Sequence, residues 1–180
     1  AETIASETMA SEVTAGEVKQ QQEKSIQAEK SVPPAYLPQG RCFSREDLEI
    51  LSSGKISSVL GAEFAGQDDY AIQVRMPEPP LLLCDRVTGI DAVAQSMQLG
   101  TIWTETDVTD TSWYTHRGYM PGGIFIEAGQ ADLLLISYLG IDSLNKGERA
   151  YRLLGCELEF LGPLPKVGDT LQYEIGRAHV

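Results

Sequence analysis

The sequence predicts an α+β fold in which a curved antiparallel sheet wraps round one long buried helix. Residues 122–139 place apolar side chains on every side of a helix of that length, which is typical of a buried helix. Residues 97–105, 149–160 and 171–175 show alternation or near-alternation of side chains, the period of strands with one face on a core. A buried helix surrounded by strands indicates the α+β class.

Composition excludes several kinds of protein. The chain has 180 residues and a formal net charge of −12, whereas a nucleic-acid surface needs clustered Lys and Arg. Its longest apolar concentration, Leu133–Leu139, is far shorter than the ~20 residues of a membrane span. Two histidines and three scattered cysteines leave little for a zinc site and indicate a reducing compartment. We therefore expect a soluble cytoplasmic domain without nucleic-acid or membrane partners.

Residues 1–42 are predicted to be a disordered, acidic, Pro-containing linker. The first thirty residues contain no aromatic side chain and too few apolar ones to offset the entropy lost on ordering. Pro33, Pro34 and Pro38 then favour an extended spacer. A linker that opens a chain without Met suggests a piece of a larger multidomain protein, and a cleaved or tagged chain is the alternative.

The elements of the predicted domain, residues 43–175, follow from local signals. Ser44 is expected to cap a helix that carries acidic residues in its first turn and ends near Gly54. Residues 81–87 and 97–105 are predicted strands, and a polar, aromatic loop follows them to Pro121. Pro121 suits the first turn of the long helix, and Gly140 suits its C-terminal cap.

One stretch of the chain holds the residue types of an acid–base site. His116 lies in the loop before the long helix, and Glu127 and Gln130 lie on one face of it at an i, i+3 spacing. Burial would raise the pKa of Glu127 and keep the carboxyl group able to donate a proton. An imidazole is a natural proton acceptor near neutral pH. Gly122 and Gly123 would leave backbone N–H groups free to hold an oxyanion at the helix start.

Together these groups suit β-elimination of water from a 3-hydroxyacyl thioester. His116 would remove a proton beside the thioester, and Glu127 would protonate the departing hydroxyl group. Neither a metal ion nor a redox cofactor is required. Other interpretations stay open at this point: His116 as a surface residue, Glu127 as an exposed side chain, and Gly122–Gly123 as a plain turn.

Several motifs recur in the order found in a known family. The chain resembles the β-hydroxydecanoyl-type acyl-carrier-protein dehydratases, and it is similar above all to the dehydratase domains of polyunsaturated fatty acid synthases. The motifs are Ser44–Leu48, Pro80–Val87, Met120–Gly122 with Glu127, Gly147–Ala150 and Glu159–Gly162, together with the runs Ile126–Ser137 and Asn145–Gly155.

The resemblance implies a hot-dog fold and assigns roles to the site residues. It makes His116 the catalytic histidine, Glu127 its acidic partner and Gly122 the oxyanion amide, and we expect Gly123 to assist and Gln130 to position the substrate. It implies no cofactor, a substrate carried on the phosphopantetheine of an acyl carrier protein, and a second hot-dog unit as partner in a homodimer or tandem pseudo-dimer. The alternatives are a non-catalytic pseudo-dehydratase unit and a hot-dog acyl thioesterase.

The C-terminal residues do not fit this pattern. Residues 174–180 neither alternate nor resemble the family, and they can be read as translated adapter DNA. We therefore expect a sheet truncated at its C-terminus, a non-native tail at 176–180 and no function for His179. A truncated sheet would keep an unpaired edge.

Overall fold

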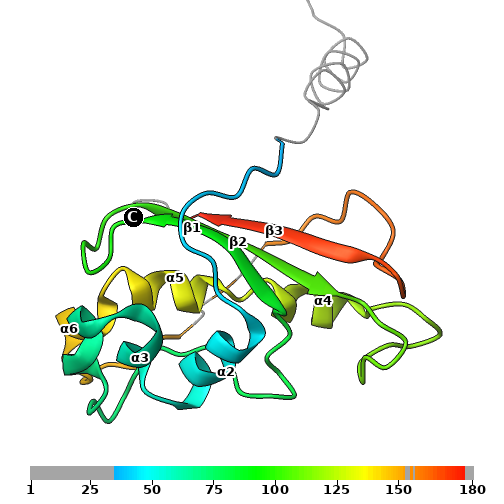
Figure 1. Ribbon diagram of the computed structural model, residues 1–180. Coiled ribbons are helices and arrows are strands. Elements are labelled where there is room, and N and C mark those ends of the chain that lie inside the picture. Colours follow the sequence, from blue (N-terminus) through cyan, green and yellow to red (C-terminus); the bar gives the residue numbers. More distant parts are fainter. Residues whose placement is uncertain (1–34, 153–154, 156, 177–180) are drawn as a thin grey trace, which may run out of the picture. The chain divides into compact units, whose positions relative to one another are not determined.

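The computed structural model describes residues 35–152, 155 and 157–176. Within this range three strands, β1 (Arg86–Ala92), β2 (Gly100–Asp107) and β3 (Thr170–Gly176), form an open antiparallel sheet in the order β1-β2-β3. Helices pack beneath one face of the sheet (Figure 1). The predicted α+β class is confirmed.

The strands agree in part with the sequence analysis. β2 pairs with β1 from Arg86↔Glu105 to Ala92↔Gly100, with an irregularity after Val87. β2 also pairs with β3 from Thr101↔Gly176 to Asp107↔Thr170. The alternation at 171–175 correctly predicts β3, whereas β1 begins where the strand predicted at 81–87 nearly ends.

The first helices follow their local signals. α2 (Arg45–Ser53) begins with a capping box, in which Ser44 accepts from the Asp47 N–H and the Asp47 carboxylate accepts from the Ser44 N–H. It ends at Gly54, as predicted. The chain then forms α3 (Ile56–Leu60) and the 3₁₀ helix η1 (Ala62–Gln67).

The single long helix predicted over residues 122–139 is wrong. The structure has two short helices, α4 (Gly122–Ala128) and α5 (Asp132–Tyr138), followed by α6 (Ile141–Asn145). The break falls at Gly129, whose missing Cβ leaves room for the ring of Tyr173 on β3: a methyl group there would lie 3.2 Å from that ring. α5 faces the core, but within α4 only Ala128 is fully buried.

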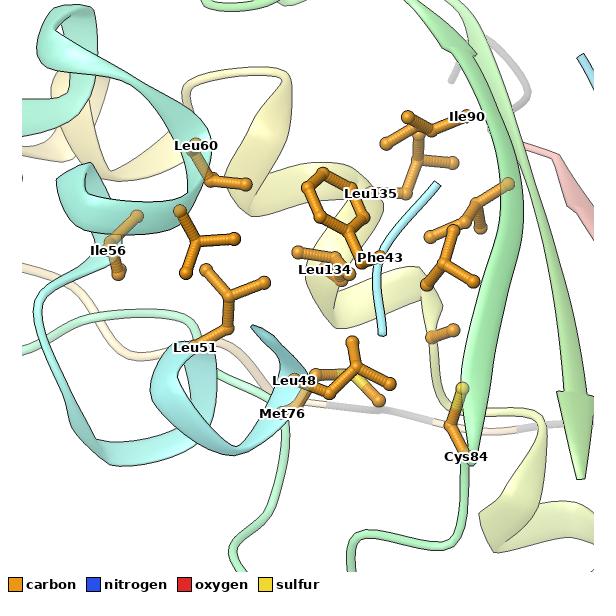
Figure 2. Packing of buried hydrophobic residues seen from close by; sticks show 14 of the residues in the cluster. Phe43, Leu48, Leu51, Ile56, Leu60, Met76, Cys84, Ile90, Leu134 and Leu135 are labelled. Carbon is orange, nitrogen blue, oxygen red and sulfur yellow. The ribbon is translucent and has the colours of Figure 1, made fainter. Parts of the chain in front are cut away.

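The core lies between the sheet and the helices. Figure 2 shows side chains of α2 and α3 meeting Leu134 and Leu135 of α5 and Ile90 of β1. The loop between β1 and β2 closes the end of α5: the Gln95 N–H donates to the Tyr138 carbonyl (3.0 Å) and the Met97 N–H to the Leu139 carbonyl (2.8 Å). These bonds satisfy carbonyl groups that a helix end leaves unpaired.

Two further expectations differ from the structure. The described residues of the range 149–160 form no strand and are exposed, so the strand predicted there is absent from that part of the chain. The folded unit begins at Tyr36 rather than at residue 43. Its early residues bind the rest of the unit: the Tyr36 hydroxyl pairs with Thr88 Oγ1 (2.5 Å), and Arg41 donates to the Leu60 carbonyl (2.7 Å).

The remaining part of the predicted linker, residues 1–34, and the predicted tail residues 177–180 lie outside the described residues. In the part of the chain that is described, no helix is both long and apolar enough to cross a membrane.

Candidate active site

His116 sits at the first position of a tight hairpin. Its N–H donates to the Tyr119 carbonyl (2.9 Å) and the Tyr119 N–H donates to the His116 carbonyl (3.0 Å). Arg117 and Gly118 between them both have positive φ, 52° and 80°, which is the geometry of a type I′ turn. The imidazole is exposed and has no hydrogen-bond partner among the described residues. The turn therefore fixes the backbone and leaves the ring open to a reactant.

The hairpin is held against the segment that precedes β3. The Val167 N–H donates to the Gly118 carbonyl (2.8 Å), and the Met120 N–H donates to the Pro165 carbonyl (2.7 Å). Met120 is fully buried and anchors the chain just before α4. His116 and the start of α4 are therefore joined by a short connection that is anchored at both of these points.

The start of α4 has the open backbone that the sequence predicts. Pro121 is the N-cap and supplies no side-chain cap. A methyl group on Gly122 would meet the Phe160 ring at 3.6 Å and Leu164 at 3.9 Å, whereas one on Gly123 would meet nothing within 4 Å. The first N–H groups of a helix have no acceptor within it, so this end can donate to an oxygen atom of a ligand.

Glu127 and Gln130 come together as their spacing predicts. The Gln130 side-chain amide donates to Glu127 Oε2, and the Gln130 N–H donates to the Glu127 carbonyl (3.2 Å). The Glu127 side chain is exposed, however, so the predicted burial of this carboxyl group is wrong. The reason is that α4 is fully buried only at its C-terminal end, at Ala128.

The structure does not join the two halves of the predicted acid–base pair. No hydrogen bond or ion pair links His116 to Glu127 within the part of the chain that is described. Both side chains face solvent. An acid–base site built on them needs another surface to exclude water.

Aromatic side chains surround the helix break. The Phe125 ring lies 5.7 Å from the ring of Phe160 and 5.6 Å from that of Tyr173. The Tyr173 hydroxyl donates to the Phe125 carbonyl (2.8 Å), and burial raises the pKa of this phenol. The segment before β3 carries exposed apolar side chains, Phe160 and Leu161 among them. This end of the molecule has an apolar surface beside the open backbone of Gly122.

A second polar pair was missed by the sequence analysis, which treated Asp132 as a satisfied or interface residue. Tyr151 donates from its hydroxyl to Asp132 Oδ2 (3.3 Å) at the start of α5. Burial raises the pKa of Asp132, and burial together with the nearby carboxylate raises the pKa of Tyr151. Gln130 and Tyr151 both line a cavity of about 320 Å³. The only sequence signal was an Asp within an apolar run.

Among the described residues no group of three His, Cys, Asp or Glu side chains is placed to hold a metal ion. A second cavity of about 320 Å³ lies elsewhere on the domain and includes Arg45, Asp85 and Trp113. It contains none of the predicted site residues.

No family model matches the chain. The chain is 40% identical over 134 residues, 74% of its length, to a subunit of the polyunsaturated fatty acid synthase from Thraustochytrium sp.. The match covers 9% of that protein, so the chain corresponds to a small part of a much longer relative. It is therefore related to a segment of a polyunsaturated fatty acid synthase.

Proposed function

We propose that the chain is part of a hot-dog dehydratase domain that acts in fatty acid synthesis. Its reaction is the removal of water from a 3-hydroxyacyl thioester carried on an acyl carrier protein, which yields the enoyl thioester. The observation that carries the proposal is the 40% identity to part of a polyunsaturated fatty acid synthase over 134 residues. The motifs around His116 and Glu127 supply the chemistry.

The proposed reaction uses three groups from the hairpin and α4. His116 removes a proton from the carbon beside the thioester, and the electrons move onto the thioester oxygen. The backbone N–H groups of Gly122 and Gly123 stabilise the resulting oxyanion. Glu127, held by Gln130, then protonates the hydroxyl group as it leaves as water. Each acid or base accelerates such a reaction by about 10²–10⁴-fold.

The exposure of His116 and Glu127 gives the proposed second hot-dog unit a role. A partner that covers the apolar surface near Phe160 would exclude water and lower the local dielectric. The partner is a second copy or a neighbouring repeat of the parent synthase. We therefore expect activity to depend on that pairing.

The proposal is tested with a 3-hydroxydecanoyl thioester of an acyl carrier protein, and products are identified by mass spectrometry. The expected product is the enoyl thioester, which is lighter by one water molecule. His116→Asn is expected to remove this activity, whereas Tyr119→Phe in the same hairpin keeps it. Free acid as the only product would instead support the thioesterase alternative.

A non-catalytic pairing unit is the second candidate. It is favoured by one observation: no hydrogen bond or ion pair joins His116 to Glu127 among the described residues, and both face solvent. In that case the chain alone and the chain paired with a second unit would show no turnover that depends on His116. Pairing itself, measured by sedimentation, would persist in His116→Asn.

A further inference from the structure

A closed ring of hydrogen bonds lies away from the candidate active site. The Gln67 side-chain amide donates to Ser143 Oγ (2.9 Å). The Val74 N–H donates to Asp142 Oδ2 (2.8 Å), and the Gln73 side-chain amide donates to the Gln67 carbonyl. Residues 73–74 and 142–143 are consecutive pairs, so these three bonds close a ring. It joins the end of η1, the 73–74 segment and the first turn of α6.

Three members of this ring each leave one buried oxygen atom unpaired. Gln67 Oε1, Gln73 Oε1 and Asp142 Oδ1 have no hydrogen-bond partner among the described residues. Asp142 is 0% exposed and Gln67 is 1% exposed. Buried polar atoms in native proteins almost always have a partner, which can be a water molecule or an ion. Because all three unpaired atoms are acceptors, the missing partner must be positively charged or must donate hydrogen bonds.

The nearest cationic side chain in the sequence does not fill this role. Arg75 is adjacent to the ring, but its guanidinium group donates to the carbonyl groups of Leu51 (2.9 Å) and Gly54 (2.8 Å). Asp142 therefore receives one backbone N–H and no hydrogen bond from Arg75. A buried carboxylate with so few partners is costly unless a counter-charge accompanies it.

The number and charge of the oxygen atoms select the occupant. One water molecule brings two protons to three acceptors and leaves the carboxylate charge uncompensated. A cation is coordinated by all three oxygens at once and cancels that charge. A single carboxylate matches one positive charge, whereas calcium sites of useful affinity gather more ligands and more negative charge. Carboxylate and amide oxygens are the ligands of hard cations rather than of transition metals.

We propose that Asp142 Oδ1, Gln67 Oε1 and Gln73 Oε1 bind one sodium ion that locks α6 to η1. An entry path exists, because Gln73 and Val74 also line the cavity of about 320 Å³ that reaches Gln130. The site stabilises the helical end of the domain. It is independent of the proposed dehydratase chemistry, and its test does not require activity.

The test measures thermal unfolding of the full chain at neutral pH in increasing sodium chloride or tetramethylammonium chloride at matched ionic strength. Tetramethylammonium is too large to enter a ring of this kind. A bound ion stabilises the folded state as its concentration exceeds the dissociation constant, so Tm is expected to rise with the logarithm of the sodium concentration. The two salts are expected to diverge progressively. Identical Tm curves in both salts would mean that a proton or water fills the ring, and would overturn the proposal.

Variants separate the site from general effects of charge. Gln73→Met removes one ligand and keeps the side-chain length, so it is expected to shift the sodium response to at least about tenfold higher concentration. Asp142→Asn is expected to abolish the response. Asp69→Asn removes the same charge from an exposed neighbouring position and should retain the full response. If Asp142→Asn does not fold, Gln73→Met still decides the matter. A wild-type response in Gln73→Met, or an equal loss in Asp69→Asn, contradicts the site.

Discussion

The hydroxyl group of Tyr173 donates a 2.8 Å hydrogen bond to the carbonyl of Phe125, which ties β3 to α4 just before the helix break at Gly129. The Phe125 carbonyl lies near the end of a seven-residue helix. Carbonyl groups near a helix end have no intrahelical donor. The contact between these two residues therefore both satisfies the helix and sets where it stops.

Tyr173→Phe is expected to lower the free energy of unfolding by about 1–2 kcal/mol, because it leaves a carbonyl group beside buried surface without its donor. Chemical denaturation monitored by circular dichroism measures the loss. Tyr119→Phe is the matched control: Tyr119 is 50% exposed and its hydroxyl has no partner among the described residues. Equal stabilities of the two variants would show that the Tyr173 bond contributes nothing.

Gly140 joins α5 to α6 with a φ of +98°, where an L side chain is strained. A methyl group there would lie 2.8 Å from Gln95 Oε1 and 2.9 Å from Gln95 Cα. Gln95 cannot withdraw easily, because its N–H is bound to the Tyr138 carbonyl. Gly140→Ala is therefore expected to destabilise the domain by about 1–3 kcal/mol.

The control for this prediction is Gly66→Ala, at a position where an added methyl group meets nothing within 4 Å. Its Tm should stay close to that of the parent chain in differential scanning calorimetry. A Gly140→Ala variant as stable as Gly66→Ala would contradict the close approach of the 93–99 loop to the end of α5.

The sequence predicts the parts of this fold that local signals determine. The Ser44 cap needs only Asp47 three residues later, and the alternation of β3 identifies it directly as a half-buried strand. The helix break at Gly129 is different, because its cause is Tyr173, more than forty residues away. An apolar run alone contains no information about that ring, so it predicts one helix where there are two.

The same limit applies to the candidate site. The i, i+3 spacing correctly places Gln130 beside Glu127, since both lie close on the chain. Whether Glu127 is buried depends on which elements cover α4, and the local pattern does not contain that information. The strand predicted at 149–160 fails for a related reason: alternation without a neighbouring strand to pair with does not make a sheet.

Asp132 makes stability depend on pH. Burial raises its pKa in the folded chain above the value of about 3.9 expected when unfolded. The folded state therefore holds the proton more tightly, and the stabilisation is fully present below the unfolded pKa. It is lost as the pH rises through the folded pKa.

Asp132→Asn is expected to remove this contribution, because an amide keeps an acceptor for Tyr151 without titrating. The Tm of the parent chain relative to that of the variant should therefore fall as the pH rises from about 4 towards neutrality. Asp110→Asn, an exposed loop substitution, should show no such trend. A pH-independent difference for Asp132→Asn would contradict the raised pKa.

Glu127→Gln tests the proposed proton donor with little disturbance of the fold. The Glu127 side chain is exposed, and a Gln there still offers an oxygen to the Gln130 amide. The free energy of unfolding is expected to change by less than about 0.5 kcal/mol. Dehydration should fall about 10²–10⁴-fold, because an amide cannot deliver a proton to the leaving hydroxyl group.

Gln130→Met separates positioning from proton transfer. It frees the Glu127 carboxylate without removing it, so we expect a smaller loss of kcat, together with a shift in the acidic limb of the pH–rate profile. Turnover and the pH profile are measured on the same 3-hydroxyacyl thioester for both variants. If Glu127→Gln retained most of the parental rate, another group would have to supply the proton, and Tyr151 with Asp132 would be the next pair to test.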